Sequence, residues 1–407
     1  MLGNTLAASF IWGINTVFLL DAGLSNFQAF AANAFFTAGM VLFEIPTGIT
    51  ADTVGRRASY LLGTATLATT TVLYVLLWKV HGPFWAWAIV SMGLGLGFTF
   101  FSGAVEAWLV DALAATGFTG SLESVFAKAQ IVGGAAMLTG SVAGGYIAQV
   151  TNLGVPFVVR AVVLLVMFVV AFFSMRDIGF EPKQGAGVLA ETRRIAAATV
   201  EHGLRVPAVR WLMFSSPFVA GVQIYAFYAL QPYLLRLYGN PKAYGIAGLV
   251  AALAAGAQIA GGIAGPRLRT LFQRRTSMLL TTTGLSALAL VAIGVLGSFA
   301  FALVLIVIWG LLFAAAMPIR QAYLNGLIPS AQRATILSLD SMMGSAGGVV
   351  IQPALGRAAD VWSYGTSYVV AGAISALALP FILLSRREGA AADVTAARAA
   401  TASSVPT

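Results

Sequence analysis

The residues that could do charge-based chemistry are few, and the densest group lies between two long apolar segments. The decapeptide GITADTVGRR, residues 48–57, places the acid Asp52 just before two arginines. The segment 27–47 before it contains one charge, Glu44, and the segment 58–78 after it contains none. Each segment is long enough to cross about 30 Å of hydrocarbon as a helix, so we expect the charged turn at a membrane face.

The composition also predicts a membrane protein. The chain is 59% hydrophobic and 9% charged, with a mean hydropathy of +0.88, whereas soluble domains carry roughly 25% charged residues. It has no cysteine and only two histidines, so we expect no disulfide, no metal site and no bound cofactor. The net charge of +9 comes from short basic clusters between apolar runs, which argues for membrane topology and against nucleic-acid binding.

Hydropathy predicts an all-α integral membrane fold. The first span begins near the initiator methionine without an A-x-A cleavage site, so we expect a retained helix. Arginine and lysine gather on one face, which the positive-inside rule makes cytoplasmic together with both termini. The expected spans are 3–22, 27–48, 58–78, 84–110, 125–150, 155–175, 208–235, 243–265, 276–296, 298–322, 335–358 and 364–385.

These twelve helices are expected to form two six-helix bundles with pseudo-two-fold symmetry. The short repeats EAWLV (106–110) and QAYLN (321–325) lie at corresponding places in the two halves. The polar segment between the halves is predicted as a cytoplasmic linker with an interfacial helix, Val188 to Leu204, and the Ala-rich tail as disordered. The predicted domains are the bundle 1–175, the linker 176–207, the bundle 208–387 and the tail 388–407.

The pattern G-x-x-x-D-x-x-G-R-R resembles the signature loop between helices 2 and 3 of major facilitator superfamily transporters. In that family the aspartate and first arginine form a cytoplasmic latch with an acid at the end of helix 4, and Asp111 stands at that place. Gly48 would let a neighbouring helix approach. The alternative is that the charges only anchor the loop at the lipid headgroups. The predicted latch comprises Gly48, Asp52, Gly55, Arg56, Arg57 and Asp111.

Four acids within the predicted spans are candidates for proton coupling, because a carboxylate in hydrocarbon costs at least about 2.5 kcal/mol and needs a reason to be there. They are Asp21, Glu44, Glu106 and Asp340. Each has an alternative: Asp21 at the outer interface, Glu44 in the latch, Asp340 near the cytoplasm. Arg160 is a possible counter-ion for Asp21, or it snorkels to the interface.

Helix 5 contains AAMLTGSVAGGYIA, in which Gly140, Gly144 and Gly145 would permit tight helix packing. The run resembles the G-P-x-x-G-G motif of drug/proton antiporters, with Ser141 in place of proline. The arginine that many proton-coupled members carry in helix 4 is also absent.

Polar and aromatic residues on the central spans predict the substrate cavity. Aromatic walls with few fixed charges suit amphipathic or aromatic molecules better than sugars or phosphate. The candidates are Asn15, Asn33, Phe36, Gln223, Tyr225, Tyr228, Gln231 and Trp309.

The resemblance therefore implies a secondary transporter of the drug-efflux-like branch in a bacterial inner membrane. It would export small amphipathic molecules in exchange for protons by alternating access, as a monomer in the lipid bilayer. Alternatives are uptake or exchange of a small metabolite, or an uncoupled receptor or lipid scramblase derived from such a transporter. An enzyme is not expected, because neither histidine has a readable catalytic partner, and no G-x-x-x-x-G-K-[ST] loop is present for ATP.

Overall fold

The chain is helical throughout the part that the computed structural model describes, residues 2–101, 103–182, 203–329 and 332–394. The only strand-like pairing in these residues is an isolated antiparallel bridge between Arg274 and Val394. Ten helices there are long and apolar enough to cross a membrane, or eleven if the bent pair at the N-terminus counts as one span. This is the all-helical membrane architecture predicted from the hydropathy.

Two compact units divide the chain. Unit 1 comprises residues 1–192 and 228–252, and unit 2 comprises residues 193–227 and 253–407. The bundle boundaries expected from the sequence, at 175 and 208, remain a prediction. The helices of unit 1 are α1 (Leu2–Trp12), α2 (Asn15–Asp21), α3 (Asn26–Thr53), α4 (Arg56–Val80), α5 (Phe84–Thr99), α6 (Ala104–Ala115), α7 (Leu122–Val150) and α8 (Gly154–Ser174).

The helices α10 (Pro207–Tyr238) and α11 (Tyr244–Leu268) run through both units. The remaining elements belong to unit 2. They are η2 (Arg269–Leu271), α12 (Arg275–Leu296), α13 (Phe299–Leu327), α14 (Arg333–Val361), α15 (Tyr364–Ala376), α16 (Ala378–Arg387) and η4 (Ala391–Asp393).

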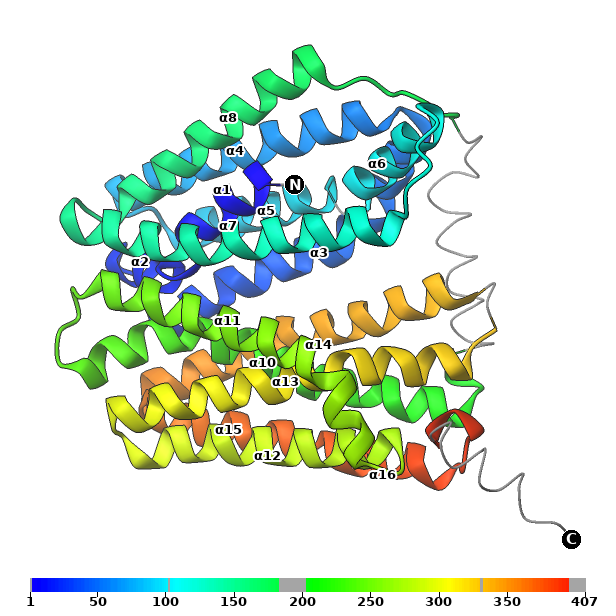
Figure 1. Ribbon diagram of the computed structural model, residues 1–407. Coiled ribbons are helices and arrows are strands. Elements are labelled where there is room, and N and C mark those ends of the chain that lie inside the picture. Colours follow the sequence, from blue (N-terminus) through cyan, green and yellow to red (C-terminus); the bar gives the residue numbers. More distant parts are fainter. Residues whose placement is uncertain (1, 102, 183–202, 330–331, 395–407) are drawn as a thin grey trace, which may run out of the picture. The chain divides into compact units, whose positions relative to one another are not determined.

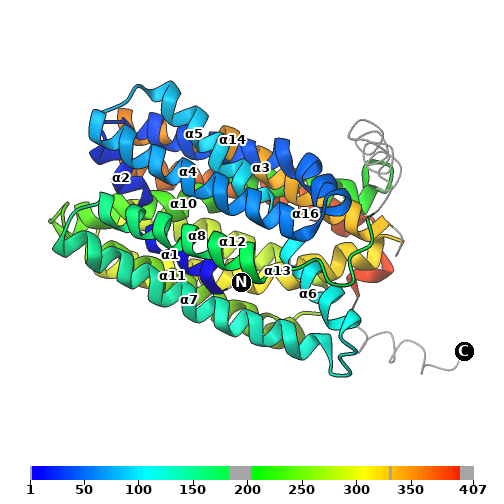
Figure 2. The same cartoon turned by 90° about the horizontal axis from the view of Figure 1, so that it is seen from above.

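Unit 1 packs around an aromatic centre. Helix α1 lies against α7 and α8, and α4 lies against α5 and α8, as Figures 1 and 2 show from two directions. The ring of Phe18 stacks on Phe157 with a centroid distance of 3.9 Å and meets the edge of Trp87 at 6.0 Å. These rings are fully buried, so this end of unit 1 is held by aromatic packing.

Unit 2 packs around α12, which contacts α13, α15 and α16. Its core includes Met213, Met278 and Tyr323, all fully buried. The Tyr323 hydroxyl lies 3.2 Å from the Ser385 hydroxyl, so a buried polar group on α13 is satisfied on α16.

Local sequence signals fix several helix ends. Ser25 caps α3 in a reciprocal pair with Gln28: the Gln28 amide donates to the Ser25 hydroxyl, and the Ser25 amide donates to the Gln28 side chain. Gly103, with φ of 69°, separates α5 from α6. The helices α1 and α2 bend by 48° at their junction, and the break is filled by a side chain described below.

Each predicted span coincides with one helix or one broken pair. Helix α14 has 29 residues but is not among the ten apolar spans, because Asp340, Gln352 and Arg357 lower its hydropathy. The predicted interfacial helix of the linker, 188–204, lies almost wholly outside the described residues.

Candidate functional site

The signature loop joins α3 to α4 and gathers one arginine and two carboxylates. Arg56 Nη1 lies 2.6 Å from Asp52 Oδ1, and Arg56 Nε lies 3.8 Å from Asp111 Oδ2 on α6. The arginine side chain is 12% exposed, while the carboxylates are 38% and 33% exposed. No described atom lies within 4 Å of a Cβ placed on Gly48, so the expected close helix approach there is not seen. The gating role of the cluster stays a prediction.

The N-terminus of α4 is capped by a residue that sequence reasoning missed. Asp177, after α8, accepts a hydrogen bond from the Arg57 amide at 2.8 Å, where the helix dipole favours a carboxylate. Gly55 has φ of 130°, and a Cβ there would collide with the Asp177 carboxylate. The Arg57 guanidinium donates to the Phe172 carbonyl at 2.6 Å. Gly55 and Arg57 therefore tie the loop to the end of α8.

Unit 2 has a similar cap at the start of α12. Asp393 is buried and accepts from the Thr276 amide and hydroxyl, both at 2.8 Å. Arg275 Nη1 donates to the Ala392 carbonyl. Residues 265–275, which precede and begin α12, contain no acid, and the acid that caps this helix comes from the C-terminal segment. The predicted disorder of the tail does not apply to residues 388–394, and residues 395–407 lie outside the described part of the chain.

The acids proposed for proton coupling occupy different environments. Asp21 is exposed and accepts from Trp78 Nε1 at 2.8 Å. Glu106 is exposed in the first turn of α6, and Glu44 is partly buried on α3. None of these three lines a described cavity.

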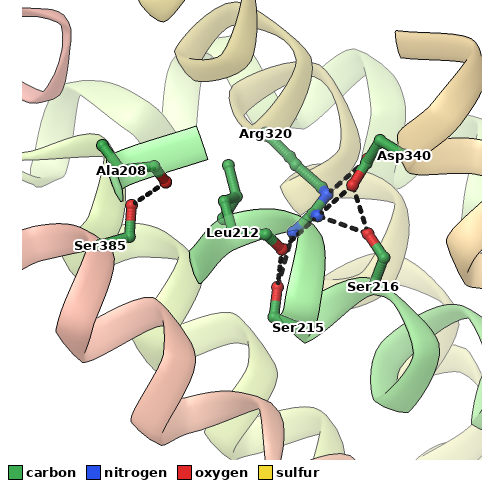
Figure 3. A network of polar contacts seen from close by, with 7 residues as sticks. All are labelled: Ala208, Leu212, Ser215, Ser216, Arg320, Asp340 and Ser385. Atoms are coloured by element: carbon green, nitrogen blue, oxygen red, sulfur yellow. Dashed lines mark hydrogen bonds and ion pairs between the residues drawn. The ribbon is translucent and has the colours of Figure 1, made fainter. Parts of the chain in front are cut away.

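The fourth acid, Asp340, belongs to a dense network (Figure 3). Arg320 on α13 reaches it with two hydrogen bonds, Nη2 to Oδ1 at 2.7 Å and Nε to Oδ2 at 3.1 Å. The same guanidinium donates to the Ser215 hydroxyl at 3.0 Å and to the Leu212 carbonyl at 2.7 Å on α10. Ser216 donates to Asp340 at 2.5 Å. Asp340 therefore acts here as the fixed partner of Arg320.

Sequence reasoning did not pair Arg320 with Asp340, although a signal was present. Helices α13 and α14 are consecutive and joined by a short connection. Arg320 lies as far before the end of α13 as Asp340 lies after the start of α14, so an antiparallel hairpin brings both to the same level.

Unit 1 encloses a small cavity of about 50 Å³. Of the expected substrate residues, four lie on its wall: Asn15 on α2, Asn33 and Phe36 on α3, and Tyr228 on α10. Asn15 Nδ2 donates to Asn33 Oδ1 at 3.0 Å, and the Phe36 ring meets Phe98 edge-on at 5.4 Å. The polar and aromatic lining residues are Trp12, Asn15, Asn33, Phe36, Tyr74, Phe98, Arg160 and Tyr228.

Arg160 lies on this cavity wall and is 4% exposed. It neither pairs with Asp21, which is bonded to Trp78, nor snorkels to the interface. Both expectations for Arg160 were therefore wrong. The physical reason is its place on α8: the side chain points into the bundle, where its guanidinium carbon lies 5.9 Å from the centroid of the Phe98 ring.

Unit 2 holds a second cavity of about 30 Å³, to which Gln223 and Trp309 contribute. Its polar lining is uncharged and comes mainly from α12, through Thr282, Thr283 and Ser286. Six of the eight expected substrate residues thus line two separate cavities, one in each unit.

Two other substrate candidates do not line a described cavity. The buried Tyr225 donates to the Ser367 hydroxyl at 2.6 Å and holds α10 to α15. Gln231 bridges the break between α1 and α2: its Nε2 donates to the Trp12 carbonyl at 2.5 Å, and its Oε1 accepts from the Thr16 amide at 2.9 Å. Gln231 thereby satisfies backbone groups that the bend frees.

The glycines of α7 allow two close helix contacts. A Cβ on Gly140 or Gly144 would collide with Ser9 or the Phe10 backbone of α1. A Cβ on Gly145 would lie 2.8 Å from the Gly248 Cα of α11. The three glycines therefore allow close packing on two faces of α7, against α1 and against α11.

Comparisons with known proteins agree with this architecture. No curated protein sequence matches the chain significantly. The nucleoside transporter NupG is structurally similar, with a TM-score of 0.76, 12% identity, and coverage of 94% of this chain and 96% of that one. The POT family transporter PepTSo has a TM-score of 0.70, 13% identity, and coverage of 95% and 96%.

The xylose transporter XylE from E. coli, in an inward-open conformation, has a TM-score of 0.68 and 14% identity over 94% of this chain and 93% of that one. At such identities the likeness shows the fold alone. A family model described as Major Facilitator Superfamily matches residues 1–271 and 213–407, which together cover the chain. With its membrane-spanning helices and this match, the protein belongs to the major facilitator superfamily and is a multi-pass membrane transporter.

Proposed function

We propose that the protein exports amphipathic small molecules with an aromatic or apolar body in exchange for protons. The observation that carries this proposal is the cavity of unit 1, where rings of Phe36, Tyr74 and Tyr228 surround a few polar groups. Rings supply contact area, and a small number of amides and one guanidinium fix orientation, which is the composition of a small-molecule site. A site for a sugar needs more polar partners than this wall supplies.

The proposed direction of transport, export, rests on the resemblance of the signature loop and the helix-4 motif to those of drug-efflux-like transporters. The cluster of Arg56 with Asp52 and Asp111 supports a gating latch. The three charges come from separate helices, so a movement of these helices can break both ion pairs together. We expect both termini in the cytoplasm of a bacterial cell and a functional monomer.

For proton coupling we propose Asp21 or Glu106 as the carrier. Both carboxylates are exposed in this structure and neither is held by an arginine among the described residues. Asp340 is bound to Arg320 and would first have to leave that network, and Glu44 is the remaining alternative.

Flux in proteoliposomes with an imposed pH gradient tests the proposal. We expect gradient-driven accumulation of aromatic amphipathic compounds that collapses when a protonophore is added. Asp21→Asn or Glu106→Gln should abolish the pH dependence while leaving downhill exchange. Movement of a hydrophilic metabolite or hexose in preference to the aromatic compounds would contradict the substrate class, and flux indifferent to the gradient would indicate an uncoupled protein.

A further inference from the structure

The cavity of unit 1 contains a charged side chain that the structure leaves unsatisfied. Arg160 is 4% exposed, and no described carboxylate lies within ion-pair distance of it. Its Nε is buried without a hydrogen-bond partner. Its guanidinium carbon lies over the Phe98 ring, 5.9 Å from the ring centroid, and Tyr74 and Tyr228 line the same cavity. Arginine stays protonated in proteins, so a permanent positive charge faces this cavity.

A second unpaired donor lines the same cavity. Asn33 Oδ1 accepts the hydrogen bond from Asn15, which turns Asn33 Nδ2 away from that contact. Asn33 Nδ2 is buried and has no partner. Among the described polar side chains of this cavity, the buried groups left without partners are therefore both donors, Asn33 Nδ2 and Arg160 Nε.

Such an arrangement is costly unless a ligand completes it. A charged arginine within the membrane is unfavourable even when it snorkels, and a buried donor without a partner adds the cost of its lost solvation. A neutral side chain at Arg160 would remove the charge penalty. The positive charge and the free amide donor are both complementary to an acceptor that carries negative charge.

The size of the cavity limits what part of a ligand binds at this place. A volume of about 50 Å³ holds a carboxylate or a few waters, whereas whole small-molecule sites need about 300 Å³ or more. A single guanidinium neutralises one negative charge, so a multivalent anion would remain uncompensated. The rings of Phe36, Phe98 and Tyr228 adjoin the donors and suit an aromatic body.

We propose that Arg160 and Asn33 form a subsite for the carboxylate of an aromatic monocarboxylate substrate. The guanidinium binds the carboxylate oxygens, the Asn33 amide donates a further hydrogen bond, and the rings contact the aromatic body. This inference rests on the proposed function, since it names the substrate class of the same cavity.

Thermal unfolding of the full-length protein in detergent tests the subsite. The probes are matched carboxylates, carboxamides and methylammonium compounds on naphthalene, indole and biphenyl rings. We expect the carboxylate of at least one ring system to raise the unfolding temperature of the wild type by several degrees, and its amide and cation to have little effect. Arg160→Gln should weaken carboxylate binding at least tenfold, and Arg160→Lys should retain part of it.

The control variant is Arg236→Gln, which removes an exposed arginine of the same unit and should leave binding unchanged. Ligand-free Arg160→Gln should unfold at or above the wild-type temperature, because its charge has no protein partner. Equal binding of the carboxamide, or undiminished carboxylate binding by Arg160→Gln, would overturn the subsite while leaving the proposed function standing. Absence of binding by every probe would count against both.

Discussion

Two arginines that are largely shielded from solvent, one in each unit, have opposite surroundings. Arg320 is enclosed by Asp340, two serines of α10 and the Leu212 carbonyl, so its donors have partners (Figure 3). Arg160 is more deeply buried but has no hydrogen bond or ion pair among the described residues. The guanidinium of Arg320 is thus hydrogen-bonded by protein groups, whereas that of Arg160 has no such partner among the described residues.

This contrast indicates different roles: the charge of Arg320 stabilises the fold, whereas the charge of Arg160 is available to bind a ligand. A paired buried arginine is costly to disturb, because removing one partner strands the other in a poorly solvated site. An unpaired one costs stability in the empty protein, and a complementary anion recovers that cost on binding. We therefore expect substitutions at the two positions to change stability in different directions.

The largest expected effect is on Arg320. Arg320→Ala would leave Asp340 buried without its partner, and breaking such a pair costs about 3–5 kcal/mol. We expect a fall in the unfolding temperature of detergent-solubilised protein large enough to reduce membrane yield. The double variant Arg320→Met with Asp340→Leu should recover most of the loss. An unchanged unfolding temperature in Arg320→Ala would remove the basis of the comparison.

Arg160→Gln should show the converse. Its unfolding temperature should equal or exceed that of the wild type, while flux of an aromatic carboxylate falls by about ten- to a hundredfold, as expected for loss of hydrogen bonds worth about 1.5–3 kcal/mol. Flux and thermal unfolding measured on one preparation check both parts. A marked loss of stability in Arg160→Gln would show that Arg160, like Arg320, stabilises the fold.

Most of the fold could be predicted because hydrophobic length is a local property. Apolar runs located every span that the structure shows. The exception was the segment 388–394. The tail has no apolar stripe, which suggested disorder, but contacts of Ala392 and buried Asp393 with the start of α12 hold this segment in place.

The candidate site was less predictable because partners depend on tertiary contacts. Asn15 and Gln231 were both predicted to line the substrate cavity because both are polar residues on central spans. Only Asn15 lines it, whereas Gln231 hydrogen-bonds backbone groups at the break between α1 and α2. Nothing in the spacing showed that Asp177 would reach the start of α4. Arg160 was expected to pair with Asp21, but the rotation of α8 about its axis points the Arg160 side chain into the cavity.

Tyr228 tests the aromatic side of the cavity, with a smaller expected effect. Tyr228→Ala removes a ring from the wall, and such ring contacts contribute about 0.5–1.5 kcal/mol beyond buried area, so binding should weaken roughly three- to tenfold. Phe168→Ala is the matched control, because Phe168 lies outside this cavity, where it stacks on Phe172. Titration of an aromatic substrate against both variants should separate them; equal losses would argue against the aromatic wall.

The smallest effect on stability is expected at the signature loop, where the carboxylate partners of Arg56 are more exposed than the carboxylate partner of Arg320. Asp52 is 38% exposed, and exposed ion pairs contribute less than about 1 kcal/mol, so Asp52→Asn should scarcely change the unfolding temperature. If the pair nevertheless helps to hold one transport state, flux should fall several-fold, because a small free-energy difference shifts the balance between states. Membrane insertion and yield of Asp52→Asn serve as controls and should equal those of the wild type. Wild-type flux in Asp52→Asn would leave the loop as a headgroup anchor, and the distinction between structural and functional arginines would then rest on Arg320 and Arg160 alone.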